Sequence, residues 1–365
     1  MLRIPIYKPF LIGNESKYVN ECLVSNWISS LGKFVGEFEV NFAKYLNVRE
    51  AIAVSNGTVA LHLALMALDI KEGDEVIVPT FTYIASVNAI KYVGAEPVFC
   101  DSNVDTWQID PDEIIRKITK KTKAIMVVHL YGFMCNMTRI TQIAKLNNLK
   151  IIEDSSEAFG SKYNDKLAGN FGDIATFSLF GNKTITTGEG GMIVTNKQEL
   201  ASKIRTLKNQ GIRSDKEYDH EVIGYNYRMT NICAAIGKAQ LEKIDTILSK
   251  KRALAFNFFE ELKDYPIYFI KEDEKIYNSF WMITGKVANK KVRDSLRIYL
   301  SEQGIETRGA FPPVTTFPFY KMDEVCFPIA NRLSQCGLNL PSYPGLSDEE
   351  VKFICDSIKK FFNKR

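Results

Sequence analysis

The chain has 365 residues, which exceeds the usual size of a single hydrophobic core and predicts a large domain accompanied by a smaller one. The composition is 45% hydrophobic and 25% charged, and no apolar run approaches the roughly 20 residues that cross a bilayer, so we exclude a membrane-spanning class and expect a cytoplasmic protein. The net charge of +4 comes from 47 basic and 43 acidic residues that are interspersed, so neither nucleic acid nor a membrane surface is predicted as a partner.

The cysteines and histidines predict neither a disulfide framework nor a metal site. The seven cysteines are odd in number and widely spaced, and no two form a C-x-x-C pair, so we expect reduced thiols. Only three histidines occur, His62, His129 and His220, which disfavours a histidine-rich metal site. We therefore predict no bound metal.

Short apolar runs alternate with helix-like segments from about residue 50 to 195, which predicts an α/β fold with a mostly parallel sheet covered on both faces. Seven runs have the length and composition of buried strands. They are residues 51–54, 75–79, 96–101, 124–132, 150–155, 174–180 and 191–196. The Gly-rich turn between the last two is too short for a helical crossover, so this pair is predicted to be antiparallel and the sheet mixed.

Helical patterns lie between these runs, and longer ones follow them. We predict helices over residues 58–68, 86–93, 111–118, 139–147, 232–259 and 291–303 and at the carboxyl end. Residues 250–365 mix such helices with a strand near residue 284 and a Pro-rich loop. The pattern therefore predicts a large domain of residues 1–249 and a smaller α+β domain of residues 250–365.

Residues 55–58, with the sequence SNGT, lie between a predicted strand and a predicted helix. Such a junction offers unpaired backbone N–H groups and the positive end of the helix dipole to a phosphate, and Thr58 adds a hydroxyl group. An ordinary N-cap by Ser55 or Asn56 explains the same residues. By itself the segment leaves both interpretations open.

Asp154 ends the hydrophobic run KIIED, and ligands of open α/β sheets collect at the carboxyl ends of strands. A carboxylate there can keep a pyridine nitrogen protonated, which lets the ring withdraw electrons from a substrate carbanion. A helix cap or a structural ion pair would also explain the residue.

Lys183 follows another buried run and precedes a turn that contains Gly188, Gly190 and Gly191. The open backbone of such a turn could leave the amine in a cleft, where a lysine can form a Schiff base with an aldehyde cofactor and move protons. Ser178, five residues earlier, could donate its hydroxyl group to a phosphate. A surface lysine in a hairpin is the alternative for any single lysine.

Tyr83 follows a strand end in PTFTYIAS, where its ring could stack on a heterocycle, although most such aromatic residues belong to the core. Other cofactor motifs fail on spacing. No G-x-G-x-x-G follows a strand, and residues 181–184 lack the Gly-Lys pair of a P-loop. Hydride transfer and nucleotide hydrolysis are therefore disfavoured.

Seven segments together resemble one known family, the DegT/DnrJ/EryC1/StrS family of sugar aminotransferases. They read WISSLGKFVGEFE, VSNGTVALHLAL, GDEVIVPTFTYIAS, HLYG, IIEDSSEAFGS, GDIATFSLFGNKTITTGEGGMIVTN and GYNYRMTNICAAIGKAQL. The resemblance covers about residues 5–345, and residues 177–191 are its most specific part. It implies a fold-type I transferase, like aspartate aminotransferase, that depends on pyridoxal 5'-phosphate (PLP) and works as a homodimer with shared active sites.

The resemblance assigns catalytic and ring-binding roles to four residues. Lys183 matches the lysine that holds PLP as a Schiff base, and Asp154 matches the partner of the pyridine nitrogen. Tyr83 falls where the family stacks an aromatic ring on the cofactor, and Glu157 falls next to the cofactor ring. Many members have Gln at this last position.

It also assigns positions for phosphate and substrate. Gly57, Thr58 and Ser178 match phosphate-binding positions, and Asn226 matches the asparagine that the neighbouring subunit sends to the phosphate. Arg228 falls near the site of the partner subunit. Arg228 and Arg308 are candidates for the substrate pyrophosphate, and either residue could equally be a structural ion-pair partner.

Within the family the segments are most similar to members that aminate GDP-4-keto-6-deoxymannose, which also have Glu at the position of Glu157. The implied amino donor is L-glutamate, which becomes 2-oxoglutarate, and the product would serve polysaccharide (O-antigen) biosynthesis. Thr315, in the loop FPPVTTFP, departs from the His that many members carry. A UDP- or dTDP-linked keto sugar is the alternative acceptor. A PLP-dependent sugar dehydratase, which would have His in place of Lys183, and a non-catalytic regulatory protein are further alternatives.

Overall fold

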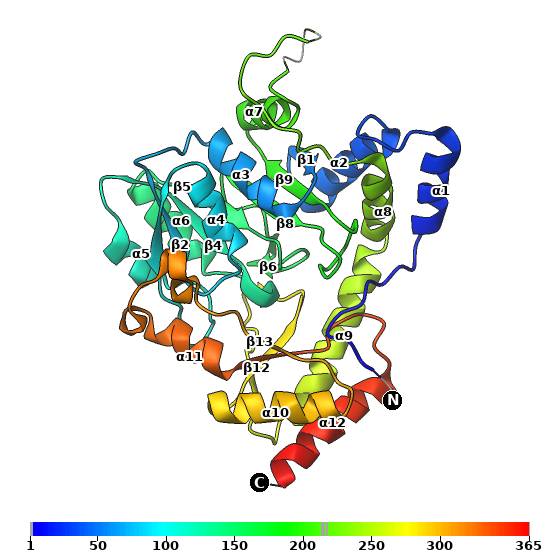
Figure 1. Ribbon diagram of the computed structural model, residues 1–365, viewed down its shortest axis with the longest axis vertical. Coiled ribbons are helices and arrows are strands. Elements are labelled where there is room, and N and C mark those ends of the chain that lie inside the picture. Colours follow the sequence, from blue (N-terminus) through cyan, green and yellow to red (C-terminus); the bar gives the residue numbers. More distant parts are fainter. Residues whose placement is uncertain (1–2, 213–215, 217, 365) are drawn as a thin grey trace.

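The computed structural model describes residues 3–212, 216 and 218–364 (Figure 1). Its largest sheet has seven strands. These are β1 Glu50–Val54, β2 Glu75–Pro79, β3 Glu96–Cys100, β4 Thr122–Val128, β5 Lys150–Asp154, β8 Ile174–Ser178 and β9 Gly191–Thr195. They lie in the order β1-β9-β8-β5-β4-β2-β3. β9 alone runs in the direction opposite to the other six strands of this sheet. The predicted seven-stranded, mostly parallel sheet with an antiparallel last pair is confirmed.

The run of residues 124–132 was predicted as one strand, and this was wrong at its end. β4 stops at Val128, and residues Leu130–Gly132 form the 3₁₀ turn η1. Tyr131 has a φ angle of 56° and Gly132 one of 87°, so the backbone leaves the extended region that a strand requires. The turn places the backbone N–H of Tyr131 beside the carboxyl end of the neighbouring strand β5.

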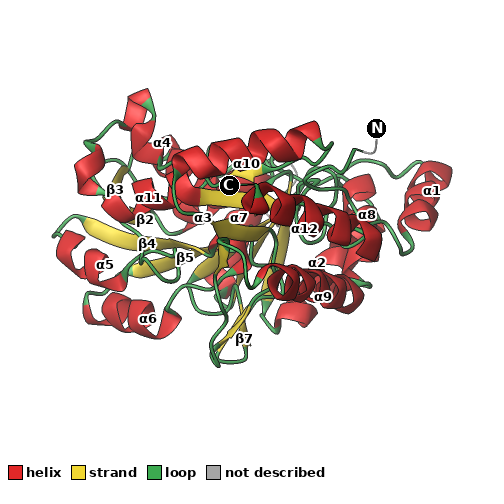
Figure 2. Cartoon of the chain, turned by 90° about the horizontal axis from the view of Figure 1, so that it is seen from below, coloured by secondary structure: helices red, strands yellow, loops and turns green. Residues whose placement is uncertain are grey.

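Helices cover both faces of the sheet (Figure 2). One face carries α3 (Gly57–Ala67), α4 (Ala85–Tyr92) and α7 (Gln198–Lys208), and the other carries α2 (Lys33–Leu46), α5 (Pro111–Lys117), α6 (Met137–Leu146) and α8 (Asn231–Leu241). Successive residues of each strand point to opposite faces. Val76 and Val78 therefore pack with α3 and α4, whereas Ile77 packs with α5 and α6.

The long helix predicted over residues 232–259 is wrong, because the structure has two helices there. α8 ends at Leu241 and α9 covers Ile244–Leu262, and Lys243 between them has φ −111° and ψ 11°. The break changes the direction of the chain. α8 packs against α1 (Glu15–Ser25) and α2, whereas α9 packs against α12 (Asp348–Asn363).

The carboxyl-terminal part has its own four-stranded antiparallel sheet, in the order β10-β12-β14-β13. Its strands are β10 Tyr268–Phe269, β12 Ile283–Lys286, β13 Arg308–Gly309 and β14 Gly337–Leu340. The helices of this part are α10 Lys290–Glu302, α11 Pro328–Cys336 and α12, and the short turns are η2 Val314–Thr316, η3 Pro318–Tyr320 and η4 Glu324–Cys326. An apolar core of residues 254–361 joins the four-stranded sheet to α9, α10 and α12, and Ile4 belongs to this core. The domain division at residue 249 stays a prediction.

A small third sheet has the order β11-β6-β7 and comprises β6 Lys162–Tyr163, β7 Lys166–Leu167 and β11 Ile276–Tyr277. It joins a loop after β5 to the carboxyl-terminal part. No helix in the described residues combines the length and apolar content that crossing a membrane requires.

The carboxyl ends of β1, β2, β4, β5 and β8 meet at one edge of the large sheet, because these strands run parallel to one another. Residues that follow these strands are far apart in the sequence and close in space. Ligands of open α/β sheets bind at this edge. The edge therefore gathers the segments that contain Asn56, Tyr83, Tyr131, Asp154 and Ser178.

Glu153 and Asp154 end β5, and their side chains point to opposite faces of the sheet. We expect Glu153 to have a structural role and Asp154 to belong to the candidate site. The two oxygens of Glu153 accept hydrogen bonds from the backbone N–H groups of Phe171 and Gly172, both at 2.6 Å, and of Gly169 at 2.9 Å. Glu153 is fully buried. It ties the loop before β8 to β5.

We expect Glu153→Gln to lower the free energy of unfolding by about 3 kcal/mol, because backbone N–H groups donate to both carboxylate oxygens and the NH₂ that replaces one of them cannot accept. Urea denaturation followed by circular dichroism measures this loss. The control is Glu96→Gln, which removes an exposed ion pair with Lys91 and should change stability by less than about 1 kcal/mol. Equal stability of the two variants would contradict the structural role of Glu153.

Candidate active site

Lys183 lies in a short turn after β8, with only 14% of its side chain exposed. Its Nζ is 3.9 Å from Oε1 of Glu157 and 4.1 Å from the centre of the Trp281 ring. The backbone is fixed on both sides, because the carbonyl oxygen of Lys183 accepts a hydrogen bond from the Tyr7 hydroxyl at 2.7 Å and the Trp281 indole donates to the Asn182 carbonyl at 2.7 Å. The amine is therefore held near a carboxyl group and against an aromatic face.

Burial lowers the pKa of the Lys183 amine, and the negative charges of Glu157 and Asp154 oppose this shift. A lysine must lose a proton before it can act as a nucleophile, so a lowered pKa increases the reactive fraction near neutral pH. The site thus has the electrostatic setting of a nucleophilic lysine, which a surface lysine in a hairpin would lack.

Glu157 lies three residues after the end of β5 and is 5% exposed. Its Oε2 accepts a hydrogen bond from the backbone N–H of Tyr131 at 2.8 Å, so its second oxygen is the one directed at Lys183. Burial raises the pKa of the Glu157 carboxyl to about 7, although Lys183 and the Tyr131 N–H group act in the opposite direction. Glu157 can therefore gain or lose a proton near neutral pH.

Asp154 is 4% exposed, and neutral donors hold both of its oxygens. The hydroxyl of Ser86, at the start of α4, donates to Oδ2 at 2.7 Å, and the backbone N–H of Ser156 donates to Oδ1 at 3.1 Å. These bonds fix the orientation of the carboxylate, and no cationic side chain of the described residues forms an ion pair with it. Such a carboxylate can stabilise a protonated nitrogen of a bound heterocycle.

The amino end of α3 lies beside the last residue of β8. Asn56 is the N-cap, and its side chain accepts from the N–H of Val59 at 3.0 Å. The first N–H groups of the helix, on Gly57 and Thr58, point outward without intrahelical acceptors. A Cβ atom on Gly57 would come within 2.8 Å of Cβ of Ser178, so glycine is needed for the Ser178 side chain to reach this helix end. The grouping of N–H donors and a hydroxyl suits a phosphate.

Four aromatic residues from different segments lie in a row at this edge. The Trp281 and Tyr131 rings are nearly parallel, with centres 6.2 Å apart, and Tyr131 and Phe311 are nearly parallel at 5.4 Å. Phe311 is 5.8 Å from Tyr83, whose side chain is 59% exposed. Tyr83 thus lies at the open end of the row and is not part of the buried core.

Thr315 does not present its side chain to solvent. It is 3% exposed, and its hydroxyl is 3.0 Å from that of Thr80, the residue after β2. The backbone N–H of Val314 also donates to the Thr80 carbonyl at 2.8 Å. These contacts dock the Pro-rich loop on the strand edge and position Phe311.

The residues predicted to bind the substrate or to reach the partner subunit's site lie farther apart than those around Lys183. Arg228 donates to Asn226 at 2.9 Å and to Asn209 at 3.0 Å, and Ser55 N–H donates to the Tyr227 carbonyl, so this segment runs beside the end of β1. Arg308 is on β13, and 58% of its side chain is exposed. Its guanidinium group is 3.6 Å from the carboxylate of Glu306. Among the described contacts, none joins Arg308 to Lys183 or Asp154.

Sequence reasoning missed several residues that contact this site. The ring of Trp281 lies against the Lys183 amine, and the Tyr7 hydroxyl donates to the Lys183 carbonyl. Ser86 orients the carboxyl group of Asp154, and Tyr131 orients that of Glu157. Ser86 lies in PTFTYIAS, the same segment as Tyr83, so its position three residues after Tyr83 was a signal that could have identified it. Trp281 and Tyr7 gave no local signal, because they reach the site from segments about 100 and 176 residues away in the sequence.

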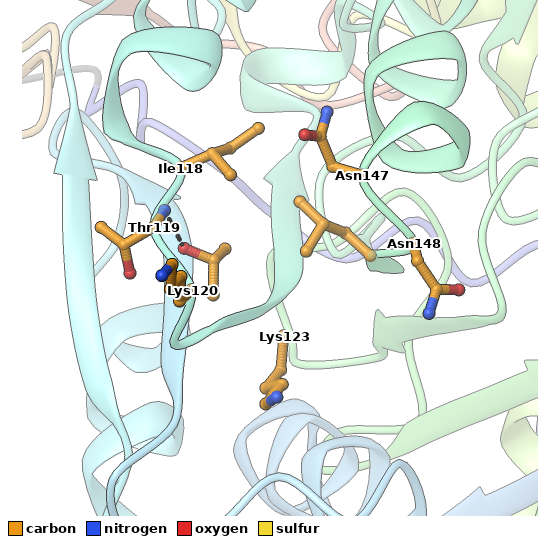
Figure 3. Close-up of a pocket in the computed structure, with 8 residues that line it drawn as sticks. Ile118, Thr119, Lys120, Lys123, Asn147 and Asn148 are labelled. Atoms are coloured by element: carbon orange, nitrogen blue, oxygen red, sulfur yellow. Dashed lines mark hydrogen bonds between the residues drawn. The ribbon is translucent and has the colours of Figure 1, made fainter.

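One cavity among the described residues lies away from this site. It has a volume of about 580 Å³ and is lined by Lys120, Lys123, Asn147 and Asn148, among others (Figure 3). These residues flank the amino ends of β4 and β5, at the opposite edge of the sheet from Asp154. A smaller cavity of about 150 Å³ lies between Asn136, Tyr163 and Lys275. Neither is lined by a predicted site residue.

Comparison with known proteins shows which family the chain resembles over nearly its whole length. The model of the DegT/DnrJ/EryC1/StrS aminotransferase family matches residues 10–359. The chain is 53% identical to the GDP-perosamine synthase of Escherichia coli O157:H7 over 100% of both chains and 48% identical to that of Vibrio cholerae over 99% of both. It also superimposes on the PLP form of Spr1654 from Streptococcus pneumoniae with a TM-score of 0.95 and 29% identity, over 100% of this chain and 99% of the other. The chain therefore belongs to the DegT/DnrJ/EryC1/StrS aminotransferase family.

Proposed function

We propose that this chain is a PLP-dependent aminotransferase that transfers the amino group of L-glutamate to GDP-4-keto-6-deoxymannose and produces GDP-perosamine. The observation that carries the proposal is the buried Lys183 amine, 3.9 Å from Glu157 and under the influence of Asp154, at the sheet edge where α/β enzymes bind ligands. Relatives named GDP-perosamine synthase that match the whole chain support the substrate assignment.

The residues at the edge fit PLP. The helix end at Gly57 and Thr58, together with Ser178, offers donors for a phosphate, and the glycine leaves room for it. Among the described residues, buried oxygens of Ser155, Asn182 and Thr184 have no hydrogen-bond partner, and these residues directly flank Asp154 and Lys183. Buried polar atoms are usually satisfied, so these three oxygens are available to a bound polar group or to water.

Bound PLP supplies an aldehyde for covalent chemistry and a ring that withdraws electrons. Lys183 would hold the cofactor and move a proton between its Nζ and the reacting carbon. Asp154, fixed by Ser86 and Ser156, would keep a proton on the pyridine nitrogen. The Tyr83 ring would cover one face of the heterocycle, and Trp281 would exclude water from the amine.

For the acceptor, we expect kcat/KM to be at least about tenfold higher with GDP-4-keto-6-deoxymannose than with UDP- or dTDP-linked 4-keto-6-deoxy sugars, equivalent to about 1.4 kcal/mol. Binding of the nucleotide far from the reacting carbon would orient the keto group, and Arg228 and Arg308 are the candidate pyrophosphate ligands. A transamination assay with glutamate and a panel of nucleotide keto sugars measures the ratio.

The same panel separates the alternatives. A preference for a UDP- or dTDP-linked sugar would overturn the GDP assignment and leave the aminotransferase proposal intact. Loss of a sugar hydroxyl without transfer of nitrogen would instead indicate a dehydratase. No turnover with any sugar would favour a regulatory protein.

A homodimer with shared sites is part of the proposal. Trp27, Leu31 and Ile223 are 55%, 77% and 88% exposed, and exposed apolar side chains that gather on one face can form an interaction surface. They flank the segment that contains Asn226 and Arg228, because the backbone of Asn231 is bonded to that of Ser29. We propose that a second copy of the chain covers these residues and that its Asn226 lies near the phosphate donors. The cytoplasmic location stays a prediction.

We expect mixed dimers of Lys183→Ala and Asn226→Ala to recover about one quarter of wild-type activity. Half of randomly paired dimers contain both variants, and each of these has one intact site if the two residues come from different subunits. The assay follows activity after subunit exchange. Lys183→Ala mixed with Asp154→Ala is the matched control and should recover nothing, because both residues belong to one subunit. If Asn226→Ala is impaired alone and the first mixture stays inactive, the sites are not shared.

A further inference from the structure

Glu157 and Lys183 form a buried acid–base pair whose two members are held in different ways. The Glu157 carboxyl is fixed, because its Oε2 accepts from the Tyr131 N–H at 2.8 Å. Tyr131 is itself clamped between the Trp281 and Phe311 rings, and its hydroxyl accepts from the Phe311 N–H at 3.1 Å. The Lys183 amine, by contrast, makes no hydrogen bond among the described contacts and lies between Glu157 and the Trp281 ring.

The free oxygen of Glu157, Oε1, is the one that lies 3.9 Å from the amine. A charge-assisted hydrogen bond is about 2.8 Å long, so a displacement of Nζ of roughly 1 Å brings the pair into contact. Oε1 can take up a proton while Oε2 continues to accept from Tyr131. The geometry therefore allows proton transfer without loss of the bond that fixes the carboxyl group.

Burial favours a neutral pair over an ion pair. Two charges in a desolvated site are costly unless their geometry is good, and 3.9 Å is a long ion-pair distance. Burial raises the pKa of Glu157 to about 7 and lowers that of Lys183, so the two values move toward each other. The other titratable groups that act on the pair are Asp154, whose charge favours the protonated form of both members, and Tyr131.

We propose that Glu157 and Lys183 share one proton, and that Glu157 accepts the proton that Lys183 must lose before its amine attacks a carbonyl carbon. In this step an N–H bond of the ammonium breaks, its electron pair stays on nitrogen, and an O–H bond forms on Glu157. The pair has zero net charge before and after. The use of the freed amine rests on the proposed function, whereas the shared proton is a property of the chain itself.

Competitive labelling of the full-length, cofactor-free chain with dilute acetic anhydride tests the proposal. The reactivity of Lys183 is followed by mass spectrometry from about pH 5 to pH 11. We expect two steps separated by more than about one pH unit, because the one-proton state contains a fraction of neutral amine and only loss of the second proton makes it fully reactive. A single step in the wild type overturns the proposal.

Glu157→Gln is the matched variant, since glutamine can still accept from the Tyr131 N–H but cannot take up a proton. We expect it to show one step only. Two steps in this variant would assign the coupling to another group and would also overturn the proposal. Lys208, 3.1 Å from Glu39, is the internal control, and its profile should be the same in both proteins. None of these outcomes depends on cofactor binding, so failure here would leave the aminotransferase proposal untouched.

Discussion

Lys183→Ala is expected to lower kcat for transamination by on the order of 10⁴-fold, the largest effect of any substitution considered for this chain. The variant loses the amine that would hold PLP and the group that would move a proton, and general acid–base catalysis alone accounts for up to about 10⁴-fold. The fold should persist, because the side chain makes no hydrogen bond to any other described residue and its backbone hydrogen bonds with Tyr7 and Phe180 remain. Steady-state assays with glutamate and the GDP-linked keto sugar measure the loss.

Borohydride reduction identifies the residue that binds the cofactor. In the wild type, peptide mapping should place the pyridoxyl group on Lys183, and the label should be absent from Lys183→Ala. Lys183→Arg keeps a positive charge but not a nucleophilic amine, so it should be as inactive as Ala. Lys91→Ala, at an exposed lysine paired with Glu96, should retain full activity and full labelling. A pyridoxyl group on another lysine of the wild type would contradict the assignment of Lys183 as the residue that binds PLP.

Asp154→Asn should lower kcat by on the order of 10²- to 10³-fold, a loss typical of removing one preorganised electrostatic group. Asparagine has nearly the same shape, and its carbonyl oxygen can still accept from Ser86 or Ser156. What it lacks is the negative charge that would keep the pyridine nitrogen protonated. The thermal midpoint should change little, because the lost bonds are few.

The adjacent Glu153→Gln variant is the matched control for Asp154→Asn. Both substitutions replace a buried carboxylate at the end of β5 by its amide. We expect opposite profiles, with Glu153→Gln losing stability but keeping kcat at temperatures where it is folded. If Asp154→Asn instead lost mainly stability and kept kcat, Asp154 would be a structural residue.

The sequence by itself determined most of the strands of the large sheet and pointed to the two central residues of the candidate site. Strand runs such as residues 75–79 were predicted with the bounds that β2 has, since a buried strand between two helical layers is continuously apolar and ends at polar or Gly-rich turns. Asp154 and Lys183 were candidates because Asp154 ends such a run and Lys183 follows one, and the resemblance to the family assigned their roles. The family was predicted because whole segments, rather than single residues, matched it.

Only the tertiary structure decided which distant residues complete the site. The carboxyl ends of parallel strands meet at one edge, so Tyr131 after β4 reaches Glu157 after β5, and Trp281 reaches Lys183 from about 100 residues away. No local pattern encodes such contacts, because they depend on strand order and on a loop with positive φ at Tyr131. The same reason explains the error at residues 232–259, whose helical pattern is continuous. The break at Lys243 follows from α8 and α9 packing against different partners, which sequence periodicity does not contain.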